Sequence, residues 1–111
     1  MDQHPYFTET IQRLQAELET LRDVYQRAKN RLAGKDPEWE IRRQRLEAEV
    51  FHAVKTFRED DPPSKAVYII GKIQAAVKEM DQPRILVRDY ETRRKRYAEA
   101  CASAGRKATQ F

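Results

Sequence analysis

Apolar residues recur along the first third of the chain at alternating steps of four and three residues. This is the spacing of a heptad seam, in which each apolar position faces a partner helix. It predicts one long helix over residues 5–33, starting at Pro5 and ending at Gly34, the residue type that best forms a left-handed helix end. The seam consists of Phe7, Ile11, Leu14, Leu18, Leu21, Tyr25, Ala28 and Leu32.

Three further helices are predicted by apolar residues at helical spacing between turn residues. The clearest start is at Asp36 and Pro37, where a capping carboxylate precedes a proline in the first turn. Gly105 is expected to end the last helix. The predicted ranges are 37–58, 62–80 and 83–104, and the last two begin at prolines, which lack the N–H that continues a helix. The helix over 62–80 has the broadest apolar side and is expected to be the most buried.

Short connections between these helices predict the fold class, because consecutive helices joined by few residues pack as antiparallel neighbours. We expect an all-α protein: an antiparallel four-helix bundle, or helical hairpins completed by dimerisation, with a long heptad-patterned first helix. A chain of 111 residues supports one core, so residues 1–105 are predicted to form a single domain and residues 106–111 a flexible tail. The first helix is longer than the second. Its first turns, including Phe7 and Ile11, are therefore expected to extend beyond the second helix with their apolar side unpaired. The alternative is that these turns fray or fold back.

A second apolar side is present on two of the predicted helices. Ile41 and Phe51 lie away from the main stripe of the helix over 37–58, and Tyr68 and Gly71 do the same on the next helix. Close packing would explain a glycine in the middle of a helix. A second apolar side fits an oligomer or a bound partner, and burial within a monomer fits nearly as well. The candidate partner interface consists of Phe7, Ile11, Leu14, Ile41, Phe51 and Tyr68.

Positive charge is concentrated at the end of the chain. Residues 81–111 hold eight basic and four acidic side chains, so the whole net charge of +4 lies there. A basic helix face of this kind contacts phosphates in nucleic-acid-binding proteins. Pairs four residues apart, Asp89 with Arg93 and Glu91 with Lys95, would make it a salt-bridged solvated face instead. The candidate phosphate-binding residues are Arg84, Arg88, Arg93, Lys95 and Arg96.

Residues that could support catalysis or metal binding do not form a complete motif. Glu49 and His52 have the spacing found in di-metal helical bundles, but the second copy of the motif is missing. His52 and Lys55 resemble the His-x-x-Lys of histidine phosphotransfer domains, which are four-helix bundles with a solvent-facing histidine, although Thr56 stands where that pattern has glycine. The alternative is a solvated histidine. Cys101 lies in an apolar stripe and is interpreted as a buried thiol.

Class and location can also be predicted. No run approaches the roughly 18 apolar residues of a membrane span, the N-terminus has no signal-peptide pattern, and one cysteine excludes an internal disulfide. We therefore expect a cytoplasmic, non-enzymatic protein without cofactor, metal, membrane or small-molecule partner. Its predicted function is helical protein–protein interaction or assembly, as an adaptor or scaffold that binds itself in a homo-oligomer or binds another protein. The alternative is a small basic nucleic-acid-associated protein that contacts phosphates through its C-terminal helix.

Overall fold

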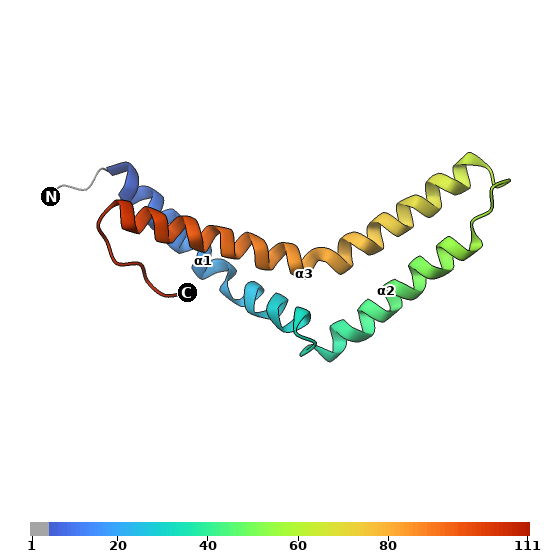
Figure 1. Cartoon of the computed structure of the whole chain (residues 1–111), viewed down its shortest axis with the longest axis horizontal. Helices are drawn as coiled ribbons and strands as arrows, with labels where there is room; N and C mark the ends of the chain where they lie inside the picture. Colours follow the sequence, from blue (N-terminus) through green and yellow to red (C-terminus); the bar gives the residue numbers. More distant parts are fainter. Residues whose placement is uncertain (1–4) are drawn as a thin grey trace. The chain divides into compact units, whose positions relative to one another are not determined.

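The computed structural model describes the main chain from residue 5 to residue 111, with side chains from residue 8 onward. Within these residues it contains three α-helices and no β-strand: α1 (Pro5–Leu32), α2 (Pro37–Thr56) and α3 (Pro63–Ser103) (Figure 1). The all-α class is confirmed. The four-helix bundle is wrong, because the helices predicted over 62–80 and 83–104 are one continuous helix.

Pro83 lies inside α3 and does not end it. A proline within a helix removes one backbone hydrogen bond and crowds a carbonyl in the preceding turn, at a cost of about 3 kcal/mol. Apolar positions nevertheless continue at helical spacing on both sides, and Met80 and Val87 are both half-buried. Packing of the turns before and after Pro83 therefore outweighs the local cost, and the boundary predicted at residues 81–83 is wrong.

The other helix ends follow the predicted capping residues. Gly34 and Gly105 have left-handed φ angles of 72° and 68°. The N–H of Lys35 donates to the carbonyl of Asn30 at 2.8 Å, and an equivalent bond follows Gly105, as in a Schellman motif. At the start of α2, the Asp36 carboxylate accepts a hydrogen bond from a main-chain N–H of the first turn. Local capping chemistry therefore sets these boundaries.

Contacts within the chain gather into two units. Unit 1 consists of the chain up to Lys29 together with Arg84–Phe111, and unit 2 consists of Asn30–Pro83. Unit 1 therefore pairs α1 with the C-terminal half of α3, and unit 2 pairs α2 with the N-terminal half. That residues 1–105 form a single domain stays a prediction.

The core of unit 1 is built from the heptad seam of α1. Leu18 is fully buried, and the ring of Tyr25 stacks on that of Tyr90 with 4.0 Å between centroids. The seam is confirmed as core from Ile11 to Ala28, whereas Leu32 is exposed and the Phe7 side chain lies outside the described residues. The central cluster consists of Ile11, Leu14, Leu18, Tyr25, Tyr90, Tyr97 and Cys101.

The core partner of α1 differs from the one predicted. The short turn at Gly34 suggested the helix over 37–58, but the residues packed on the seam come from α3. α3 has 41 residues and is therefore about 60 Å long. It reaches the first turns of α1, where Ile11 is only 3% exposed. The unpaired extension predicted at Ile11 is therefore wrong.

Residues 106–111 run back along α3 within unit 1 (Figure 1). The hydroxyl of Tyr97 accepts a hydrogen bond from the main-chain N–H of Thr109 at 3.1 Å, and the Phe111 ring meets the edge of Tyr97. The guanidinium of Arg94 donates to the main-chain oxygen of Phe111 at 3.3 Å. The sequence predicts a flexible tail, whereas in the structure Thr109 and Phe111 of this segment contact Tyr97 of α3.

Candidate protein-binding surface

Unit 2 is a helical hairpin with a narrow core. Its buried residues are Trp39, Leu46 and Ala53 on α2, and Ile69, Ala76 and Pro83 on α3, each set at seven-residue spacing. Seven-residue spacing keeps a single line of contact along two antiparallel helices. Since the unit consists of little more than these two helices, this line is all that they enclose.

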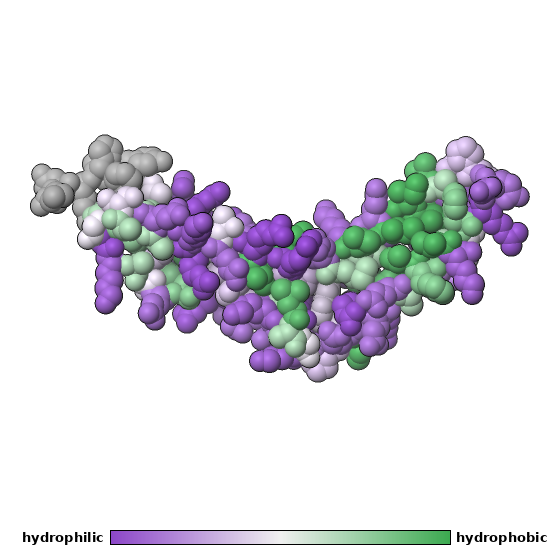
Figure 2. Space-filling model, viewed as in Figure 1, coloured by the Kyte–Doolittle hydropathy of each residue, from purple (hydrophilic) through white to green (hydrophobic). Residues whose placement is uncertain are grey.

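Large apolar side chains flank the core line and remain 46–70% exposed. We call six of them the hairpin face: Phe51, Val54, Phe57, Val67, Ile70 and Val77. Figure 2 shows hydrophobic surface gathered over the joined ends of α2 and α3. Val67, Ile70 and Val77 belong to the helix that was predicted to be the most buried. That prediction is wrong, because α2 covers only a narrow line of α3.

The two helices meet on the hairpin face in a hollow of about 220 Å³. Its lining residues are Val54, Phe57, Ile69, Ile70 and Ile73. Because all of these side chains are apolar, a water molecule in the hollow finds no side-chain hydrogen-bond partner, and replacing that water by an apolar group is favourable. The hollow also shows that α2 and α3 contribute to one continuous surface.

The opposite edge of the hairpin is polar. The guanidinium of Arg42 donates to both carboxylate oxygens of Glu79, with Nε–Oε1 at 2.8 Å and Nη2–Oε2 at 3.0 Å. This hydrogen bonding lowers the pKa of Glu79 below its usual range. With the core at heptad positions a and d, Arg42 and Glu79 hold g positions, whereas Val54 and Ile70 hold e positions on the other side. The hairpin is therefore amphipathic across its width.

The predicted interface residues fall into two groups in the structure. Ile11 and Leu14 are buried in unit 1, so they are not surface on which a partner could bind. Ile41, Phe51 and Tyr68 are exposed, as an interface requires, but only Phe51 belongs to the hairpin face. Ile41 holds an outward f position, and Tyr68 is on the side of α3 away from Ile70.

Sequence reasoning missed most of the hairpin face because it assigned those residues to core stripes. The signal that could have found them was the width of the apolar stripe on the helix over 62–80, which one partner helix cannot cover. Within the described part of the single chain, nothing packs closely on Gly71. A Cβ added to Gly71 would meet no atom of the described residues within 4 Å.

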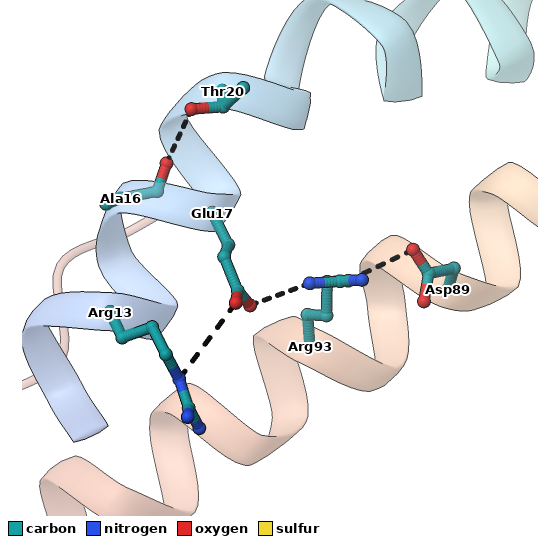
Figure 3. A network of polar contacts seen from close by, with 6 residues as sticks. All are labelled: Arg13, Ala16, Glu17, Thr20, Asp89 and Arg93. Atoms are coloured by element: carbon teal, nitrogen blue, oxygen red, sulfur yellow. Dashed lines mark hydrogen bonds and ion pairs between the residues drawn. The ribbon is translucent and has the colours of Figure 1, made fainter.

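The predicted phosphate-binding residues lie on the C-terminal half of α3, and Arg93 is paired within unit 1. Arg93 donates a hydrogen bond to Glu17 of α1 at 2.7 Å and another to Asp89 at 3.0 Å. Both bonds raise the pKa of Arg93, and the bond to Asp89 has the larger effect. Arg13 lies 4.0 Å from Glu17 on the same network. Figure 3 shows the Glu17 carboxylate between Arg13 and Arg93. This network links α1 to α3.

The remaining basic residues are exposed on α3: Arg84, Arg88, Lys95 and Arg96. Arg88 and Arg96 line a groove of about 700 Å³ between α1 and α3 within unit 1. Three carboxylates, those of Glu17, Asp89 and Glu99, line the same groove. The groove is therefore of mixed charge, which weakens its attraction for a polyanion.

The histidine and cysteine candidates belong to different units. His52 is exposed on α2, whereas Cys101 is 1% exposed in the core of unit 1. The resemblance to histidine phosphotransfer domains implies a four-helix bundle, and the described part of the chain has three helices. Among the described residues, no three His, Cys, Asp or Glu side chains are grouped so as to hold a metal ion. Within the same part of the chain, no helix is long and apolar enough to cross a membrane.

Comparison of the chain with protein-family models, with curated proteins and with solved structures finds no match.

Proposed function

We propose that this chain is a non-enzymatic helical interaction module that binds a protein through the hairpin face. The observation that supports the proposal is the exposure of six large apolar side chains on one face of a two-helix unit. They expose on the order of 500 Å² of apolar surface, at the upper end of the roughly 300–600 Å² found for the largest patch on a monomer. The largest apolar patch on a monomer is often functional.

The pattern on α3 supports the same proposal. Its N-terminal half has apolar residues at positions a, d and e of each heptad: Ala66, Ile69, Ile70, Ile73, Ala76, Val77 and Met80. An a/d pattern suits a helix with one partner, whereas an added e position suits a helix with two neighbours in a bundle. Within unit 2, α2 supplies one neighbour. A binding partner would supply the second.

Site-specific photo-cross-linking tests the proposal. Benzoylphenylalanine replaces Val67, which belongs to the hairpin face, or Tyr68, which follows it on another side of α3 and is similarly exposed. We expect a discrete cross-linked polypeptide from position 67 and none from position 68 when the producing cells are irradiated. Absence of a product at position 67, or equal products at both positions, would contradict the proposal.

Phosphate binding by α3, the alternative that the sequence leaves open, has weaker support. Arg93 is engaged by two carboxylates, and the groove lined by Arg88 and Arg96 is of mixed charge. We expect weak affinity for DNA and RNA. Tight binding that falls steeply as the salt concentration rises would favour this alternative.

A further inference from the structure

We infer that the partner of the hairpin face is a second copy of this chain, bound face to face about a two-fold axis. The inference rests on the proposed function and names its partner. In each copy the e positions Ile70 and Val77 of α3 are about half exposed, so within the described part of unit 2 only α2 packs on this stretch of α3. Two hairpins joined in this way form a four-helix bundle, and one contact between identical faces supplies the missing neighbour to both copies.

The charge pattern of α3 fits contact with itself. Near a two-fold axis each residue meets its own copy, so a charged residue there would face a like charge. Between residues 67 and 77 the e and b positions of α3 are Val67, Ile70, Gln74 and Val77, none of which is charged, and the charged positions Asp81 and Arg84 follow beyond Val77. On α2 the e positions Glu40 and Glu47 are acidic, and the Arg42–Glu79 pair sets Glu47 at the level of Val77, so an axis that keeps these carboxylates apart passes near Ile70 and Val54.

The size of the face also fits a dimer. Two such faces would bury about 1,000 Å² of apolar surface, and their polar borders would bring the total toward the roughly 1,200–2,000 Å² of a specific interface. A second copy presents a face of the same area and width, so the two faces can cover each other. An interface at the lower end of this range predicts a dimer that dissociates at micromolar concentration.

Sedimentation equilibrium of the full chain from about 1 to about 200 µM tests the inference. We expect twice the chain mass of 13.1 kDa at the upper end of this range. Ile70→Glu should weaken the dimer at least about tenfold, because it places two carboxylates near the axis. The matched control is Ile41→Glu, which changes a residue of equal type and similar exposure on an outward position and should leave the dimer unchanged. A wild-type monomer at about 200 µM, or equal effects of both substitutions, would overturn the inference.

The mass of the product cross-linked at position 67 separates this inference from the proposed function. A product of twice the chain mass supports both. A product that joins the chain to a different polypeptide supports an interaction module and overturns self-association. No product, from a variant whose circular dichroism matches the wild type, overturns both.

Discussion

Arg42 on α2 holds both carboxylate oxygens of Glu79 on α3, in the paired geometry that suits a guanidinium and a carboxylate. Both side chains are nearly half exposed, so the pair contributes little beyond fixing the edge of the hairpin. We predict that Arg42→Glu and Glu79→Arg each lower the melting temperature slightly, and that the double exchange restores most of it. Thermal unfolding at about 50 mM and about 500 mM salt checks this, because salt should reduce both losses. Additive losses in the double variant would contradict the pairing.

Acid should destabilise unit 2. The pKa of Glu79 is lowered by hydrogen bonds from Arg42, that of Asp61 by the N–H of Arg58, and that of Asp36 by the N–H of Trp39. A carboxyl group whose pKa is lower in the folded state stabilises that state above the unfolded pKa, near 4, and loses this contribution as pH falls through the folded pKa. We therefore expect the melting temperature to be flat from about pH 7 to about pH 5 and to fall below about pH 4.

Asp36→Asn, Asp61→Asn and Glu79→Gln combined should remove most of the acid-dependent change between about pH 5 and about pH 3. Thermal scans of the wild type and the triple variant across this range make the comparison. An equally steep fall in both proteins would show that other carboxyl groups dominate.

The Tyr25–Tyr90 stack contains one satisfied and one unsatisfied hydroxyl. Tyr25 donates to Glu91 at 3.2 Å, whereas the buried hydroxyl of Tyr90 has no hydrogen-bond partner among the described residues. Tyr90→Phe removes an uncompensated polar group and should leave the free energy of unfolding equal or raise it by about 1 kcal/mol. Tyr25→Phe should lower it by about 0.5–1.5 kcal/mol, since a hydrogen bond is lost and the stack is kept. Urea denaturation measures both changes in the free energy of unfolding. A marked loss of stability in Tyr90→Phe would indicate that the Tyr90 hydroxyl has a hydrogen-bond partner.

The glycines at positions 34 and 71 should respond oppositely to alanine. Gly34 has a φ of 72°, so alanine there is strained and should cost about 1 kcal/mol. Gly71 is exposed inside α3, and a methyl group added there meets open space among the described residues, so alanine should stabilise the helix by about 0.5–1 kcal/mol. Chemical denaturation of the two variants measures both effects. A loss of stability or of dimer in Gly71→Ala would show that something packs on that outward position.

Most helix ends could be predicted from local residue types. The pairing of helices that lie far apart in the chain could not. A capping residue acts on main-chain groups within a few positions, so its effect can be predicted from the sequence. This holds for Gly34, for Gly105 and for the start at Asp36 and Pro37. Pro83 is the counter-example. Its local cost is real, but residues far away in the chain pack on the turns around it and keep α3 continuous.

The candidate surface was harder to predict than the helices. The broad apolar stripe on residues 62–80 indicates burial, but a stripe does not say which chain buries it. In the structure α2 packs on this stripe within unit 2. Its position identifies the residues of the stripe that α2 leaves exposed. Phe51 was recognised because it lies apart from the core stripe of α2. Ile70 and Val77 were not, because they are continuous with the core of α3.

The position of Cys101 makes the chain's single thiol a natural reporter of one unit. It is 1% exposed among the central residues of unit 1, and no second cysteine in the sequence competes with it. A thiol reagent can reach this sulfur only when the surrounding packing opens. The rate of labelling, compared with that of the unfolded chain, therefore measures the opening free energy of unit 1 without any engineered label.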